Sequence, residues 1–464
     1  MLDVSSEDIT EGPLLQTLVA LAAPLLVQNL VQVAQQVVDL FWVGRLGESQ
    51  VAGVGFTFPV VGLITIALVG VFVGTQVVVS QRVGGDDEAG ARRAAVQGVL
   101  LGVVSGLLLA GLVAWLAGPL VRTLTLGQLS AEVAGYAASY LAIWGFALVP
   151  AGVSDALEAG FVGWGDSRAS LYINVTAVLG NIVLDPILIF GLWGAPALGV
   201  QGAALATVLG YVGGALLAVG LAAVGSRSFT LTRAAVQFDA QDAREVIDIG
   251  MPSAGEHAAS QSVRVIIIAL VAIVGAGPAL AAYAIGARVA SVAFIPATGL
   301  QQAAQSVVGQ NLGAGNTARA DRTTWYGAAL AGGVLAAVGL LQWVVPGPLA
   351  RLFVPEIGAA ALELAKTYLQ ILAIGYPAIG ATYLLLAGFN GAGETRTSFL
   401  IRTLQYWAVR LPIAAVGGVW LGLGVVAIFW AVTLSNVLAA VGAGAYYWYR
   451  TEDGMLRNAA ETAA

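Results

Sequence analysis

Long uninterrupted apolar runs are the feature that most limits how this chain of 464 residues can fold. A helix that crosses a bilayer needs about 20 predominantly apolar residues. Glycine, proline and charged residues divide the sequence into twelve such runs, near 14–43, 51–81, 94–117, 131–160, 169–192, 199–225, 246–274, 279–309, 323–345, 359–389, 397–421 and 423–449. Continuous runs exclude a transmembrane β-barrel, whose strands alternate apolar and polar residues. Because 58% of the residues are hydrophobic and 10% are charged, a soluble enzyme is excluded as well. The sequence predicts an all-α polytopic membrane protein with twelve transmembrane helices.

The two halves of the chain repeat each other. SQRVGGDDEAGARRAAVQG at 80–98 matches GQNLGAGNTARADRTTWYG at 309–327, and AGFVGWGDSRASL at 159–171 matches AGFNGAGETRTSF at 387–399. Pro24 and Pro252 follow the same offset of 228 to 229 positions. Six spans separate equivalent segments, so the repeats run in the same direction across the membrane and predict two six-helix lobes around a central cavity. We expect an N-lobe at 1–225, a cytoplasmic linker at 226–245 and a C-lobe at 246–464.

Arginine is distributed unevenly between the two sides of the predicted membrane. If both termini lie inside, twelve arginines fall on the cytoplasmic side and three outside, which is the bias of the positive-inside rule. The inside set is Arg82, Arg92, Arg93, Arg168, Arg227, Arg233, Arg244, Arg319, Arg322, Arg396, Arg450 and Arg457, and the outside set is Arg45, Arg122 and Arg351. We therefore expect a multi-pass plasma-membrane protein, monomeric and in contact with lipid, with both termini in the cytoplasm.

Composition and missing motifs exclude several kinds of site. The chain has no cysteine and one histidine, so disulfides, thiolate metal centres and histidine-rich metal sites are excluded. A net charge of −6 argues against nucleic acid as a partner. The GDSR and GETR turns at 165–168 and 393–396 lack the pattern of a nucleotide-binding loop, and no HExxH motif occurs. We expect no enzyme activity, no nucleotide and no cofactor, and transport driven by an ion gradient.

The first span carries a polar face that is too polar to meet lipid. Gln28, Gln32, Gln35 and Asp39 follow a 4-3-4 spacing, which places them on one side of a helix. An acid at the centre of a membrane helix costs about 2.5–3.5 kcal/mol on insertion scales, so it needs a reason to be there. This face lines a water-filled cavity and its glutamines contact substrate, or it forms a stripe of hydrogen bonds between helices.

The fifth and sixth spans supply further polar groups at a similar depth. Asn181 and Asp185 share a helical face, and Pro186 frees the carbonyl of Ile182. Counted at 1.5 Å per residue, Thr207 of the sixth span falls in the same layer as Asp39 and Asp185. Two carboxylates, an amide and a hydroxyl can ligate Na⁺ through oxygen, notably at Asp39 and Asp185, or can hold a shared proton. The alternative is a packed proline kink in which Asp185 is only structural.

The C-lobe and the fourth span carry other charges with more than one interpretation. Apolar residues replace the two acids in the second repeat, and the seventh span instead holds Glu256, His257 and Arg264. We count these three as cavity or substrate candidates; alternatively Glu256 neutralises Arg264, Arg288 or Arg410, and His257 is structural. Near the inner end of the fourth span, Asp155 and Glu158 either pair with cytoplasmic arginines or form an inner gate.

The repeated architecture, the VGQNLGAG segment that ends at Gly315 and the AGFNGAGETRTS segment at 387–398 resemble the MATE (multidrug and toxin extrusion) family. This resemblance covers essentially the whole chain. It implies a V-shaped pair of six-helix lobes that exports amphipathic or cationic small molecules by alternating access, in exchange for H⁺ or Na⁺. It also implies a coupling-cation site at Asp39, Asn181, Asp185 and Thr207. Flippases of lipid-linked precursors or polysaccharides share the layout and remain the alternative function.

Overall fold

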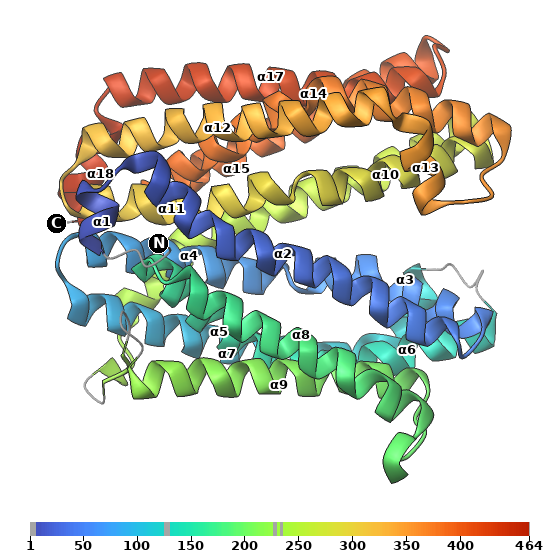
Figure 1. Ribbon diagram of the computed structural model, residues 1–464, viewed down its shortest axis with the longest axis horizontal. Coiled ribbons are helices and arrows are strands. Elements are labelled where there is room, and N and C mark those ends of the chain that lie inside the picture. Colours follow the sequence, from blue (N-terminus) through green and yellow to red (C-terminus); the bar gives the residue numbers. More distant parts are fainter. Residues whose placement is uncertain (1–5, 125–129, 226–229, 233–234, 464) are drawn as a thin grey trace. The chain divides into compact units, whose positions relative to one another are not determined.

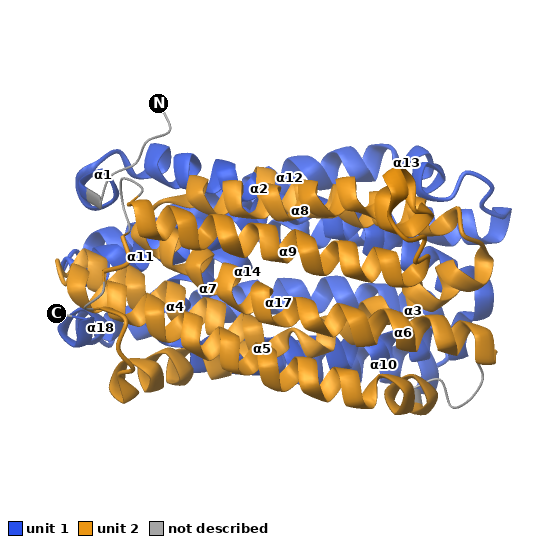
Figure 2. Cartoon of the chain, turned by 90° about the horizontal axis from the view of Figure 1, so that it is seen from below, with its two compact units in different colours: residues 1–26, 255–464 blue, residues 27–254 orange. Residues whose placement is uncertain are grey.

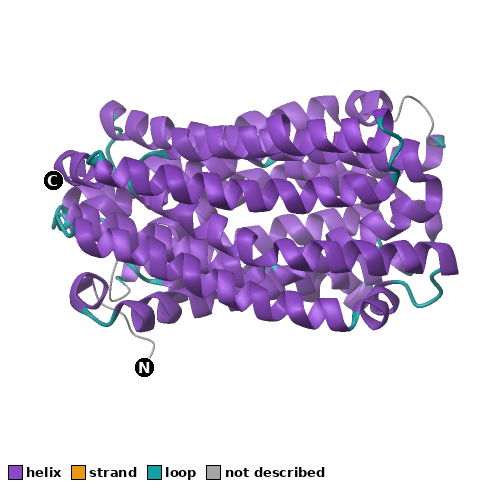
Figure 3. Cartoon of the chain, turned by 90° about the horizontal axis from the view of Figure 1, so that it is seen from above, coloured by secondary structure: helices purple, strands orange, loops and turns teal. Residues whose placement is uncertain are grey.

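The computed structural model describes residues 6–124, 130–225, 230–232 and 235–463. Figure 3 shows helices joined by short loops, and no strand occurs in these described residues. Arg227 and Arg233, which the orientation argument uses, lie outside the described residues. The predicted all-α fold class is confirmed.

The helices follow one another with few residues between them (Figure 1). The first half of the chain forms α1 (Ser6–Glu11), α2 (Leu14–Gly44), α3 (Glu48–Ile64), α4 (Ile66–Gly84), α5 (Glu88–Leu124), α6 (Ala131–Trp144), η1 (Gly145–Ala147), α7 (Leu148–Trp164), α8 (Ser167–Phe190), η2 (Leu192–Gly194) and α9 (Val200–Val224). The second half forms α10 (Ala240–Ala293), α11 (Ile295–Gly313), α12 (Thr317–Val344), α13 (Pro346–Phe353), α14 (Ala359–Gly391), α15 (Thr395–Thr403), η4 (Leu404–Arg410), α16 (Leu411–Ala415), η5 (Val416–Trp420), α17 (Val425–Glu452) and α18 (Met455–Ala463).

Ten helical segments of the described residues are long and apolar enough to cross a membrane. The other two predicted spans are present in a broken form. The eighth is the end of α10 plus α11, and α10 turns at Ala276, whose φ is 51°. The eleventh runs from α15 through the π-helical segments η4 and η5. The repeat is also visible in the backbone, since α3 and α4 meet at Thr65 while α10 and α11 meet at Phe294.

The chain divides into two compact units (Figure 2). Unit 1 comprises Met1–Leu26 and Gly255–Ala464, and unit 2 comprises Val27–Ala254. These bounds differ from the predicted lobes because α2 and α10 each contribute to both units. Asn311 Nδ2 donates to the carbonyl of Ile9 at 3.2 Å, which ties the N-terminal segment to α11 in unit 1. Arg82 forms an ion pair of 2.7 Å with Asp242, which ties the start of α10 to α4 in unit 2.

Each unit has its own buried core. In unit 2, α8 packs along α9 and α5 along α7, around aromatic side chains such as Trp144 and Phe161. In unit 1, α14 packs against both α12 and α17, around Tyr376 and Phe429. Apolar packing between the helices therefore fixes the position of each helix within its unit.

Candidate functional site

Four side chains that the sequence places in one layer lie together in unit 2. With its amide oriented to satisfy both ends, Asn181 donates to Oδ1 of Asp39 at 2.8 Å and accepts from the hydroxyl of Thr207 at 3.3 Å. Asp185 lies one turn along α8 from Asn181 and interacts directly with Asp39. The structure thus brings together residues from α2, α8 and α9 that are far apart in the sequence.

Local features of α8 and α9 set the depth of these groups. The carboxylate of Asp166 caps α8 by accepting from the backbone N–H of Ala169 at 3.0 Å, which fixes where the helix begins. Small residues let α9 approach α8 closely, as they do between membrane helices generally. At Gly210 an added Cβ would lie 2.5 Å from the carbonyl oxygen of Ala177 and 3.1 Å from Cβ of Asn181. The absence of a side chain at Gly210 is what allows Thr207 to reach Asn181.

Gly210→Ala is expected to lower the unfolding temperature of the protein in detergent. The new methyl group forces α9 away from α8, and overpacking of this kind costs about 1–3 kcal/mol. Gly220→Ala is the matched control, because Gly220 lies in the same helix and an added Cβ there meets nothing within 4 Å. Equal unfolding temperatures for the two variants would contradict the close packing described for Gly210.

The electrostatics of this site call for a positive charge. Asp185 is 0% exposed, and its Oδ2 has no hydrogen-bond partner within the described residues. A buried carboxylate oxygen without a donor is costly, and a second carboxylate beside it adds repulsion unless a proton or a cation is shared. No group of three or more His, Cys, Asp or Glu side chains among the described residues could hold a metal ion. The donor set of two carboxylates, an amide and a hydroxyl fits Na⁺ or H⁺ rather than a transition metal.

The glutamines of α2 do not behave alike. The amide nitrogen of Gln35 lies 2.8 Å from the side-chain amide of Asn181, beside the acidic layer. Gln28 donates to Glu158 at 3.0 Å and accepts from the hydroxyl of Ser170 at 2.9 Å. Gln32 is half-buried and forms no hydrogen bond with the described residues. Gln28 thus matches the interpretation of a stripe between helices, whereas Gln32 stays a candidate for contact with substrate.

The expected pairing of Glu158 with a cytoplasmic arginine is wrong. Glu158 is buried, and its Oε2 accepts from Gln28 and from Ser170 at 3.0 Å each. Arginines at that end of unit 2 are used elsewhere, since Arg82 and Arg93 both bind Asp242. A neutral hydrogen-bonded setting for a buried acid could not be read from helical spacing, because both donors come from other helices.

In unit 1, Glu256 pairs with none of the three arginines that the sequence offered as partners, Arg264, Arg288 and Arg410. Glu256 forms an ion pair of 3.1 Å with Arg402, and both side chains are largely buried. The counter-ion interpretation therefore has a structural basis, but with an arginine that the sequence reasoning missed. A signal was available: Arg402, Tyr406 and Arg410 are spaced by four residues and so share one helical face.

Arg402 belongs to a cavity inside unit 1 with a volume of about 150 Å³. Its charged and aromatic lining comprises Arg264, Tyr283, Phe294, Tyr368, Tyr383, Arg402, Tyr406 and Arg410. Of the predicted candidates, Arg264 lines this cavity, whereas His257 is exposed and does not. Arg288 is also exposed and away from the lining.

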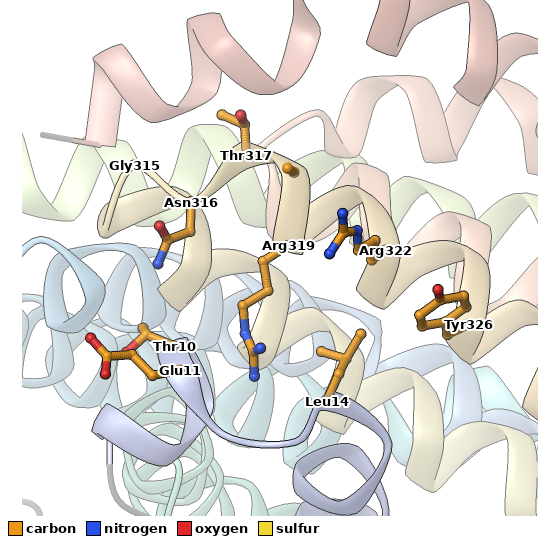
Figure 4. Close-up of a pocket in the computed structure, with 10 residues that line it drawn as sticks. Thr10, Glu11, Leu14, Gly315, Asn316, Thr317, Arg319, Arg322 and Tyr326 are labelled. Atoms are coloured by element: carbon orange, nitrogen blue, oxygen red, sulfur yellow. The ribbon is translucent and has the colours of Figure 1, made fainter.

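A second, wider pocket of about 530 Å³ lies beside the N-terminal helix of unit 1. Figure 4 shows Thr10 and Glu11 of the N-terminal segment on one side of this pocket and Arg319, Arg322 and Tyr326 along α12. Arg319 donates to the carbonyls of Ile9 at 3.1 Å and Gly12 at 2.6 Å. These bonds commit Arg319 to holding the N-terminal segment in place, and no predicted site residue lines the pocket.

The sequence is similar to known transporter proteins along most of the chain. The MatE family model matches residues 24–187 and 252–416. The chain is 29% identical over 454 residues to a probable multidrug resistance protein NorM of Pseudomonas aeruginosa, covering 97% of this chain and 91% of that protein. It is 26% identical to a probable NorM of Thermotoga maritima (88% of each chain) and 26% identical to an FAD transporter of Shewanella oneidensis (95% of each chain).

Solved structures share the fold. A MOP superfamily transporter from Pyrococcus furiosus, described as having a binding pocket of reversed polarity, superposes with a TM-score of 0.90 at 21% identity, covering 98% of this chain and 99% of that one. A MATE family transporter in an outward-facing conformation superposes with a TM-score of 0.89 at 21% identity, covering 97% and 99%.

Proposed function

The chain belongs to the MatE family of membrane transporters, and on that premise we propose that it exports small amphipathic compounds by alternating access in exchange for H⁺ or Na⁺. It is an integral membrane transporter and not an enzyme. Relatives named as probable multidrug resistance proteins support drugs as the substrate class, and we propose that these include cationic ones.

The observation that carries the coupling proposal is the acidic layer of unit 2. Asp39, Asn181, Asp185 and Thr207 bring polar groups from three helices together, and one buried carboxylate oxygen, Oδ2 of Asp185, has no hydrogen-bond donor among the described residues. A cation moving down its gradient fills this need in one conformation and is released in another. A ligand shifts a conformational equilibrium only by its difference in affinity between the two states, so the cation must bind more tightly in one state for its gradient to drive the cycle.

We assign the substrate contacts to residues that the protein leaves available. Gln32 in α2 and Arg264 in α10 have no hydrogen bond or ion pair within the described residues. Glu256 serves mainly to neutralise Arg402, and His257 lies off the cavity. Both termini are proposed to be cytoplasmic, from the arginine distribution, in a plasma-membrane protein that works as a monomer among lipids.

A flippase of lipid-linked precursors is the second candidate, and the arginines of unit 1 favour it. Arginine forks bind phosphate and pyrophosphate in a bidentate way. The acidic layer in unit 2 suits a coupling cation or a cationic substrate better than a lipid-linked phosphate, so we rank ion-coupled export first. Export of water-soluble dyes by the reconstituted protein, without movement of a lipid-linked phosphate, would support this ranking.

The test is efflux of ethidium from proteoliposomes under separately imposed Na⁺ and pH gradients. We expect one inward cation gradient to accelerate efflux well above the rate without a gradient. Equal rates with either gradient, with no gradient and with empty liposomes would contradict ion-coupled export.

A further inference from the structure

The cavity of unit 1 carries an excess of positive charge. Three arginines line it and, within the described residues, no Asp or Glu does. Glu256 neutralises Arg402 from just outside the lining. Arg410 donates only to neutral groups, to the hydroxyl of Ser435 at 2.9 Å and Oδ1 of Asn436 at 2.8 Å. Arg264 has no ion pair in the part of the chain that the structure describes, so two guanidinium charges have no protein counter-ion.

The arginines keep donors available for a ligand. A guanidinium has five N–H groups in a fixed fork and stays protonated in proteins. Arg410 uses its Nε and Nη2, which leaves Nη1 uncommitted. Arg402 uses Nε for Glu256 and Nη1 for Gln405, which leaves Nη2. These donors, with those of Arg264, suit the several lone pairs of a carboxylate or a phosphate.

Tyrosine rings fix these arginines and form the cavity walls. The guanidinium of Arg410 lies 4.3 Å from the ring centroid of Tyr406, and that of Arg402 lies 5.0 Å from that of Tyr383. Tyr283 stacks on Tyr368 at 5.4 Å with 14° between the planes. Arg410 and Tyr406 belong to the π-helical η4, a distortion that is frequent at functional sites. Aromatic walls of this kind favour an aromatic ligand.

The size of the cavity limits what it can hold. At about 150 Å³ it is smaller than the roughly 300–1,000 Å³ of pockets that enclose a whole drug-sized ligand. It has room for one ring and its charged group. Unpaired arginine within a membrane helix is also costly, about 2.5–3.5 kcal/mol on insertion scales, so a counter-anion from outside the protein would relieve that cost.

We propose that this arginine–tyrosine cavity binds the carboxylate or phosphate end of an aromatic organic anion, and that such anions are among the exported substrates. The second part rests on the proposed function, whereas binding itself does not. The phosphate of an anionic lipid shares the chemistry of the head group, but it has no ring for the tyrosine walls to contact.

The test is calorimetric titration of the full-length protein in detergent with benzoate and phenyl phosphate. Benzamide and benzylamine are the neutral and cationic probes of similar shape. We expect both anions to bind and both other probes to bind at least about ten-fold more weakly, the loss typical of removing a charge-assisted hydrogen bond. Arg264→Gln should weaken benzoate by about ten-fold or more, because this side chain has no other partner to replace.

Arg288→Gln is the matched control, because Arg288 lies in α10 and is exposed like Arg264 but is not among the residues that line the cavity. It should bind benzoate as the wild type does. Equal affinity for benzoate and benzamide, or an Arg264→Gln variant with wild-type affinity, would overturn the proposal. The proposal would also be overturned if benzoate bound in phosphatidylcholine nanodiscs but not in nanodiscs that contain phosphatidylglycerol. That result would assign the cavity to a lipid head group.

The outcome is separable from the proposed function because the titration needs no gradient. Asp39→Asn should bind benzoate with wild-type affinity even where efflux has stopped. If benzoate binding depends on Arg264 but no cation gradient drives efflux, the cavity assignment stands and only ion-coupled export is contradicted.

Discussion

Asp39→Asn is expected to reduce gradient-driven efflux to the level of empty liposomes while the protein still inserts and folds. The amide keeps the shape of the side chain but cannot take up a proton, and it offers Na⁺ no negative charge. Asp185→Asn should have the same effect, because we propose that the two carboxylates, which lie together in the layer with Asn181 and Thr207, share one cation. The measurement is ethidium efflux from proteoliposomes under each imposed gradient.

Asp248→Asn provides the control for these two variants. Asp248 is also an aspartate of unit 2, but its side chain is 57% exposed and pairs only with Arg244. It should transport like the wild type. Wild-type rates in Asp39→Asn or Asp185→Asn, under both gradients, would show that the acidic layer does not couple transport.

Glu256→Gln is expected to cost unit 1 much more stability than the loss of an exposed ion pair. The pair with Arg402 is largely shielded, with side-chain exposures of 9% for Arg402 and 13% for Glu256. Removing one partner of a buried pair typically costs about 3–5 kcal/mol, because the other charge is left uncompensated. Thermal unfolding in detergent should therefore occur at a clearly lower temperature.

Two further variants separate charge from other effects of Glu256→Gln. The double variant Glu256→Gln with Arg402→Gln should recover much of the lost stability, since no buried charge is left alone. Glu394→Gln breaks an Arg–Glu pair of the same unit whose side chains are 34% and 26% exposed, and it should cost no more than about 1 kcal/mol. An effect of Glu394→Gln as large as that of Glu256→Gln would contradict the account of this buried pair.

Periodicity and depth predicted much of the candidate site. The 4-3-4 spacing placed Gln28, Gln35 and Asp39 on one face of α2, and counting residues placed Asp185 and Thr207 at the depth of Asp39. Both rules work because a straight helix fixes side-chain direction and rise per residue. The structure brings Gln35, Asp39, Asp185 and Thr207 together around Asn181, whereas Gln28 contacts Glu158 further along α2.

Contacts across helices could not be predicted in the same way. One of the two interpretations of Glu158 paired it with an arginine, but its partners are Gln28 and Ser170, and the partner of Glu256 is Arg402. Such pairs depend on the rotation of one helix against another, which spacing along a single helix does not specify. The bounds of the structural units differ from the predicted lobes for a similar reason, since α2 and α10 each pack partly in both units.

The claim that unit 2 holds the coupling site is tested most directly by cation-dependent thermal stabilisation in detergent. Binding to the folded state raises stability by mass action, so a lost site appears as a lost shift. NaCl is titrated against choline chloride at constant ionic strength, and pH is varied separately. We predict that the wild type and Glu256→Gln are stabilised by the coupling cation, the latter from a lower baseline, and that Asp39→Asn is not. A shift that persists in Asp39→Asn and disappears in Glu256→Gln would contradict the account and move the coupling site to unit 1.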